Sequence, residues 1–182
     1  DRIVASMARA AREAGVPVVA GDTKVVERGK ADGLFVNTTG VGVLDATFRP
    51  APGRACAGDV VIVSGPLARH GMAVMAAREG LAFESTITSD SACLAPLVAR
   101  LKEAAIDVHV LRDPTRGGVA SALNEIAGAS NVGVMLDEGA LPVPDDVRAA
   151  CEMLGFDPLY VANEGILLAF VPAAESRRAL DA

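Results

Sequence analysis

The chain has 182 residues, about half of them apolar, and carries a formal net charge of −6. This length corresponds to roughly one to one and a half domains, and the apolar content is ample for a buried core. The acidic balance and the lack of any basic run argue against a nucleic-acid partner, and no apolar run approaches the roughly 20 residues that span a bilayer.

The first third of the chain predicts one helix and two strands before a linker. Apolar residues share one helical face over residues 1–15, and Gly15 followed by Pro17 ends that pattern. We expect one strand over Val18–Val26 and a second strand or strand pair over Leu34–Leu44. Because the chain opens inside a helix without a starting Met, we expect it to be a fragment of something longer.

The segment Arg49–Gly58 holds two prolines and two glycines and predicts a domain boundary. We therefore assign residues 1–52 to a partial N-terminal domain and residues 58–182 to a C-terminal domain. In the second part, strands are expected over 60–63, 108–111, 132–136 and 166–171, and helices over 68–79, 91–105, 117–129, 145–154 and 173–180. Ser89 or Asp90, at the end of the polar stretch 84–90, can cap the second of these helices. This alternation predicts a layered α/β (α+β) fold in which helices cover a sheet.

The first candidate site lies at the end of the first predicted strand. Asp22, Thr23 and Lys24 follow Gly21 directly. The Lys24 ammonium could neutralise phosphate oxygens, and the oxygens of Asp22 and Thr23 could face Mg²⁺, which prefers oxygen ligands. The alternative is an ordinary turn, where Gly, Asp and Thr are common.

The second candidate site is the segment between a predicted strand and a predicted helix, which reads Arg112-Asp113-Pro114-Thr115-Arg116-Gly117-Gly118. A Gly-Gly entry into a helix leaves backbone N–H groups and the positive end of the helix dipole available to an anion, and two arginines strengthen that hypothesis. The alternative is a plain loop in which Asp113 or Thr115 is the N-cap.

The third candidate site is Asn163-Glu164-Gly165, directly before the last predicted strand. Glu164 could act as a general base or a Mg²⁺ ligand, or it could simply belong to a solvated turn. Of the two histidines, His109 alternates within an apolar strand and is expected to be structural, whereas His70 could belong to a site. The Walker A and GxGxxG patterns are both absent.

The three cysteines, Cys56, Cys93 and Cys151, are far apart and have no CxxC or Cys/His ligand spacing. We expect each of them to be a small core hydrophobe or a bystander. Reduced thiols and the lack of a signal sequence fit a cytoplasmic protein.

Read together, the polar clusters resemble the HypE-type family of hydrogenase-maturation proteins, within the PurM-like (AIR synthase-related) ATP-using superfamily. The order and spacing of the motifs carry the resemblance along essentially the whole chain. These motifs are Gly21–Val26, Asn37–Gly42, Gly58–Gly65, His70–Gly71, Arg78–Leu81, Ser89–Asp90, Leu111–Ala120 and Asp157–Gly165.

The resemblance implies a PurM-like C-terminal α/β domain, the second half of an N-terminal PurM-like domain, and an ATP-dependent carbamoyl dehydratase. In that family, ATP and Mg²⁺ serve to phosphorylate the amide oxygen of a thiocarbamoyl group on a C-terminal cysteine. Loss of phosphate and a proton leaves a thiocyanate, whose cyano group goes to the iron of a [NiFe]-hydrogenase centre. Lys24 and Glu164 would be catalytic and Asp22 would help hold the metal. The remaining cofactor-binding candidates would be Thr23, Arg112, Asp113, Thr115, Arg116, Gly117, Gly118 and Asn163.

The resemblance also implies partners and missing parts. We expect a homodimer in the full-length protein, a carbamoyl-transferring maturation partner, an iron-carrying hydrogenase-maturation complex, and neither nucleic acid nor membrane as a partner. The family has a further N-terminal half-domain and a tail with the substrate cysteine, so we expect this chain to be inactive by itself. Alternatives are another ATP-dependent synthetase or kinase of the superfamily and a non-catalytic maturation scaffold.

Overall fold

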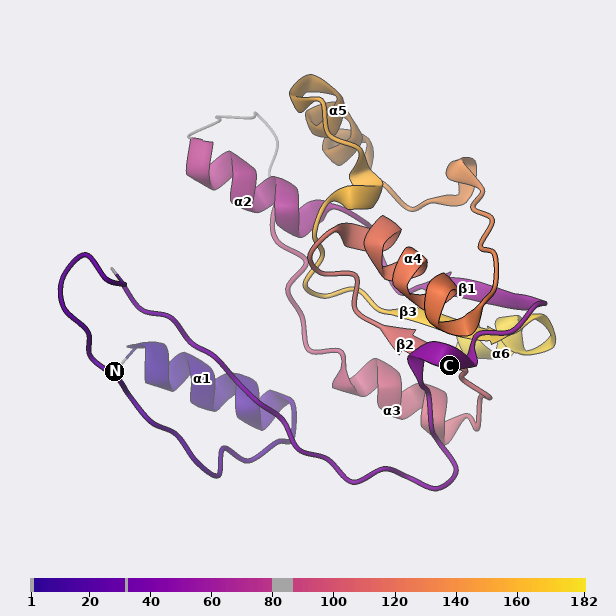
Figure 1. Ribbon diagram of the computed structural model, residues 1–182, viewed down its shortest axis with the longest axis horizontal. Coiled ribbons are helices and arrows are strands. Elements are labelled where there is room, and N and C mark those ends of the chain that lie inside the picture. The colour runs from indigo at the N-terminus through magenta and orange to yellow at the C-terminus, as the bar shows by residue number, and fades with distance from the viewer. Residues whose placement is uncertain (1, 32, 80–86) are drawn as a thin grey trace. The chain divides into compact units, whose positions relative to one another are not determined.

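The computed structural model describes residues 2–31, 33–79 and 87–182 (Figure 1). Gly80 and Leu81 of one family motif, and residues 84–86 of the polar stretch before Asp90, lie outside the described residues. The chain divides into two compact units, Asp1–Asp45 and Ala46–Ala182. The domain assignment 1–52 and 58–182 stays a prediction.

The first unit contains helix α1, Arg2–Glu13, as the apolar spacing predicts. Gly15 takes a φ of +66°, and the N–H groups of Gly15 and Val16 donate to the carbonyls of Arg12 and Ala11. This pattern is a Schellman-type C-cap, for which glycine is the favoured residue because it adopts positive φ without strain. The expected end of the helix is confirmed.

The strand predictions for Val18–Val26 and Leu34–Leu44 are wrong. No described residue of either segment lies in a strand, and several of their apolar side chains are almost fully exposed, including Val19, Val25 and Val41. A β-branched run forms a strand only where a second strand satisfies its backbone groups and a packed layer covers one face. The described residues of the first unit provide neither.

The second unit is built around a three-stranded antiparallel sheet in the order β1-β3-β2. The strands are β1 (Asp59–Val63), β2 (Val110–Arg112) and β3 (Leu168–Pro172), close to three of the four strands expected in this part. Phe170 of β3 lies opposite Val61 of β1 and Val110 of β2, so the central strand aligns the other two. The strand expected over 132–136 is wrong, because those residues form an irregular segment.

Helices cover both faces of this sheet, which confirms the layered α/β fold. Leu168 and Phe170 pack into one apolar cluster with α2 (Arg69–Glu79), α4 (Gly118–Ser130) and α5 (Asp145–Leu154). Their alternating neighbours Ala169 and Val171 pack into a second cluster with α3 (Ala95–Glu103) and α6 (Ser176–Asp181). In Figure 1, α4 and α3 lie on opposite sides of the strands. Because both faces are covered, β3 is apolar at every inward and outward position.

Short 3₁₀ helices connect these elements: η1 (Pro52–Arg54), η2 (Glu138–Ala140), η3 (Pro158–Tyr160) and η4 (Ala173–Glu175). The predicted cap of α3 is wrong, since the helix begins at Ala95 after Leu94, with a proline in its first turn. Ser89 and Asp90 are therefore available for contacts elsewhere. Among the described residues, no helix combines the length and the apolar character needed to cross a membrane.

Candidate active site

The candidate site of the second unit is organised around the buried side chain of Asn163, which is 1% exposed. Its Oδ1 accepts the N–H of Ala68 at 2.8 Å, and its Nδ2 donates to the carbonyls of Pro114 at 3.0 Å and Val161 at 3.1 Å. The amide thus joins the start of α2, the loop before α4 and the loop before β3. Since buried polar groups need partners, this side chain holds three segments in register.

Glycines let these segments approach one another at backbone distance. A Cβ on Gly118 would collide with the carbonyl of Leu159 and lie 2.8 Å from the carbonyl oxygen of Val161, and one on Gly165 would lie 2.9 Å from the N of Ala92. Gly118 also has a φ of +61°. Close packing and a positive φ therefore require glycine at position 118. This residue is the second glycine of the pair that the sequence predicts as an anion-binding site.

The loop between β2 and α4 places its charged groups at the surface. Arg112 donates to Asp113 at 2.8 Å and to Glu125 at 3.3 Å, so its charge is already balanced by two carboxylates. Arg116 is exposed, and no ion pair of its guanidinium occurs within the described part of the chain. The N–H of Gly118 donates to the carbonyl of Thr115, which closes the turn into α4. Arg116 is therefore the more available cation of the two.

Glu164 is exposed at the end of this held loop. Its backbone N–H donates to Oδ1 of Asp90 at 2.9 Å. No hydrogen bond or ion pair engages its carboxylate within residues 2–31, 33–79 and 87–182. The structure thus fixes the backbone of Glu164 and leaves the side chain available.

Asp90 contacts the backbone of Glu164, and Ser89 and His70 lie next to Asp90 and to each other; the sequence patterns assigned none of these three residues to the Glu164 site. Ser89 Oγ lies 2.9 Å from Nδ1 of His70 and accepts the N–H of Ser91. Asp90 Oδ2 is buried, and no described group forms a hydrogen bond with it. In the sequence, a polar pair such as Ser89-Asp90 is as typical of a helix cap as of a functional site. Only its position in the series of family motifs indicates that it belongs to a site.

The first unit places Asp22, Thr23 and Lys24 together on an exposed segment. The N–H of Thr23 donates to Oδ1 of Asp22 at 2.8 Å, so one carboxylate oxygen of Asp22 is hydrogen-bonded to the backbone of the next residue. The structure places these three residues next to one another, as the sequence requires. It does not relate them to Glu164 or Arg116, which belong to the second unit.

The chain belongs to the AIR synthase related family. Residues 57–182 match the model of the family's C-terminal domain, and residues 1–44 match that of its N-terminal domain.

Within this family, the chain is similar to HypE proteins, as its motifs predict. It is 55% identical over 181 residues to carbamoyl dehydratase HypE of Azotobacter vinelandii, an alignment that covers 100% of this chain and 53% of that protein. It matches the crystal structure of hydrogenase maturation protein HypE in complex with ATP with a TM-score of 0.94 and 49% identity, covering 99% of this chain and 54% of that one.

A HypE–HypF complex also contains a similar chain, with a TM-score of 0.93, 49% identity, and coverage of 99% of this chain and 59% of that one. The chain thus spans about half the length of the curated relatives it matches. The predicted resemblance to HypE-type proteins and the α/β fold class are both confirmed.

Proposed function

We propose that this chain is part of an ATP-dependent carbamoyl dehydratase that acts in hydrogenase maturation. Support comes from its similarity along the whole chain to proteins named carbamoyl dehydratase HypE, and from the HypE structure that holds ATP. In this molecule, the placement of Glu164 supports the proposal most directly. Its backbone is held by Asp90 beside the buried Asn163, and its carboxylate is exposed.

The proposed reaction begins with attack of a carboxamide oxygen on the γ-phosphorus of ATP, which releases ADP. Loss of one N–H proton gives an O-phosphorylated imidate. The C–O bond then breaks with departure of inorganic phosphate, and loss of the second N–H proton leaves a nitrile. On a C-terminal cysteine thiocarbamate, this product is a thiocyanate. Glu164 would accept a proton from the amide nitrogen, a role suited to a carboxylate that protein groups do not already engage.

Lys24, Asp22 and Thr23 would serve the phosphoryl transfer. Phosphoryl transfer is catalysed mainly by positioning and by neutralising charge on the phosphate oxygens. Lys24 would supply positive charge, and the exposed Asp22 carboxylate has the oxygen donors that Mg²⁺ prefers. Bound Mg²⁺ would supply charge neutralisation at the phosphates. Arg116, being exposed, is the better candidate in its loop for a direct phosphate contact.

The other predicted site residues would position this loop. Arg112, Asp113 and Thr115 shape the turn before α4, Gly117 and Gly118 permit its entry into the helix, and Asn163 ties the turn to the segment that bears Glu164. In the complete protein we propose a homodimer, a carbamoyl-transferring partner, and an iron-carrying maturation complex as the acceptor of the cyano group. The similar chain in the HypE–HypF complex supports the proposal of a protein partner.

The test uses a full-length protein containing this sequence, a carbamoylated C-terminal cysteine, ATP and intact-mass measurement. We expect an ATP-dependent loss of one water. Glu164→Gln and Lys24→Gln should each slow that loss by at least about 100-fold, in keeping with the usual contribution of a general base or a charge-stabilising group. The controls Glu152→Gln and Lys30→Gln remove charges that are also exposed but lie outside the proposed machinery, and they should leave the rate unchanged.

Two outcomes would overturn the proposal. Hydrolysis of ATP with transfer of phosphate to a small molecule, without loss of water, would indicate another reaction of the superfamily. Tight partner binding with no turnover of nucleotide would indicate a scaffold.

A further inference from the structure

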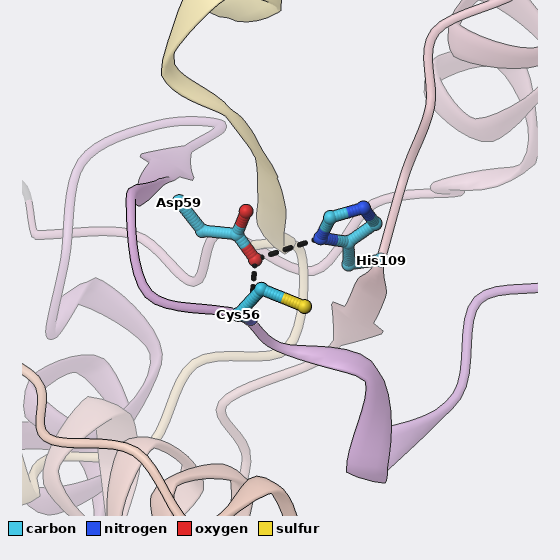
Figure 2. Close-up of side chains that lie close together, drawn as sticks. All are labelled: Cys56, Asp59 and His109. Atoms are coloured by element: carbon cyan, nitrogen blue, oxygen red, sulfur yellow. Dashed lines mark hydrogen bonds and ion pairs between the residues drawn. The ribbon is translucent and has the colours of Figure 1, made fainter.

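Figure 2 shows Cys56, Asp59 and His109 close together at the start of β1 and β2. One ligand atom from each residue lies within 4.8 Å of the other two. Nδ1 of His109 lies 2.8 Å from Oδ2 of Asp59. A thiol, a carboxylate and an imidazole are the three side-chain types that bind zinc in proteins.

A tight turn fixes two of the three groups. The N–H of Asp59 donates to the carbonyl of Cys56 at 3.1 Å, and the N–H of Cys56 donates back to Oδ2 of Asp59 at 2.8 Å. Gly58 between them has a φ of +93°, a conformation that glycine adopts without strain. These two hydrogen bonds hold Cys56 and Asp59 close to each other across the turn, which keeps the thiol near the carboxylate.

The third group is held by the sheet. The N–H of His109 donates to the carbonyl of Phe170 in β3, and its carbonyl accepts the N–H of Ala51. The other ring nitrogen, Nε2, lies 3.3 Å from Oδ2 of Asp107. A histidine that binds a metal usually donates its second ring N–H to a carboxylate, which fixes the tautomer that leaves the first nitrogen free. Asp107 can serve this function, and Arg54, 3.7 Å from Oδ1 of Asp107, holds that carboxylate in turn.

Two of the three groups are shielded from solvent. The side chains of His109 and Asp59 are 13% and 6% exposed, whereas Cys56 lies at the surface. A shielded carboxylate–imidazole pair can bind an ion with little competition from water, and the surface cysteine provides the path of entry. Cys56 and Asp59 also line a pocket of about 320 Å³ bounded by β1, α4 and the segment 132–142, which offers room for a fourth, non-protein ligand.

We propose that Cys56, Asp59 and His109 bind one zinc-type divalent ion. In the bound state Nδ1 of His109 would carry no proton and the ring N–H would lie on Nε2, toward Asp107. The thiol proton of Cys56 would be released to solvent, so that thiolate and carboxylate balance the two positive charges. In a tetrahedral site with bonds of roughly 2.0–2.3 Å, ligand atoms lie roughly 3.5 Å apart, so the Asp59–His109 contact opens slightly and Cys56 rotates inward. The soft thiolate favours zinc over Mg²⁺. This proposal is independent of the dehydratase reaction.

The test is titration of this 182-residue chain, metal-free and reduced, with Co²⁺ and then Zn²⁺. We expect one equivalent of Co²⁺ to produce a thiolate-to-cobalt charge-transfer band in the near ultraviolet, and one equivalent of Zn²⁺ to abolish it. Cys56→Ser should remove the band and weaken Zn²⁺ binding by at least about tenfold, as loss of a direct ligand should cost no less than loss of a supporting group. His109→Gln should weaken binding similarly.

Cys93→Ser is the matched control, because Cys93 is also an exposed free cysteine but lies outside the cluster. It should bind like the unmodified chain. Cys56→Ser is expected to fold normally, since the Cys56 thiol is at the surface and donates a single long hydrogen bond within the described part of the chain, to the Arg54 carbonyl at 3.4 Å. Circular dichroism checks this. The proposal is overturned if the band fails to form, if it survives Cys56→Ser, or if Cys93→Ser removes it equally.

Discussion

Replacing Gly118 with alanine tests the packing of the candidate site most directly. Gly118 opens α4, has a φ of +61°, and lies against the segment that leads to Asn163. An added Cβ would meet the carbonyl of Leu159 well inside normal contact, and would lie 2.8 Å from both the carbonyl carbon of Tyr160 and the carbonyl oxygen of Val161. All three are backbone atoms, so the overlap cannot be relieved by rotation of a side chain.

Two costs add in this variant. A left-handed conformation at alanine costs roughly 1–2 kcal/mol, and forcing extra volume into a packed site typically costs about 1–3 kcal/mol more. Gly155→Ala isolates the first cost, because Gly155 has a φ of +72° but nothing within 4 Å of an added Cβ. Gly118→Ala should therefore be about 1–3 kcal/mol less stable than Gly155→Ala.

Urea unfolding followed by helical circular dichroism measures the difference. With an m-value of about 2 kcal/mol/M, the midpoint of Gly118→Ala should fall on the order of 1 M below that of Gly155→Ala. The single tyrosine, Tyr160, lies in the contacting segment, and its fluorescence reports whether that segment is displaced locally. Equal midpoints for the two variants would refute the inference that close backbone packing requires glycine at position 118.

Two further predictions concern buried polar atoms. Asn163→Ala leaves the Ala68 N–H without its partner, so we expect a loss of stability of about 1–3 kcal/mol by urea unfolding, against a change within about 0.5 kcal/mol for the exposed control Asn124→Ala. A loss no larger than that of the control would contradict the role of Asn163. Burial, and then the charge of Asp157, raises the pKa of the Cys151 thiol above its ordinary value. The folded chain thus binds the thiol proton more tightly than the unfolded chain, and the resulting stability is present below the pKa of the unfolded thiol and lost as pH rises through the folded pKa. Native Cys151 should also react with iodoacetamide more slowly than Cys56 and Cys93, and equal rates would contradict this.

Local signals in the sequence determined much of the fold. The helices over residues 2–13, 69–79, 118–130 and 145–154 follow from apolar periodicity and from glycine stop signals, because helix hydrogen bonds close within the segment. The three strands of the second unit follow from short apolar runs. The family resemblance follows from the order of polar motifs along the chain.

Strand pairing was decided by the tertiary structure. Runs rich in valine over Val18–Val26 and 132–136 have the composition of strands, yet neither forms one, since a strand exists only with a partner that satisfies its backbone. The composition of a segment does not show whether another segment will pair with it.

The functions of single polar residues also depended on distant segments. Asn163 reads as a turn residue in the sequence but is the buried link between Ala68 and Pro114. Likewise, no spacing rule connects Cys56 or Asp59 with His109. They meet because β1 and β2 both pair with β3, which brings the first residues of those strands to one end of the sheet. Such convergence is set by hydrogen-bond register between strands, and register is a property of the assembled sheet.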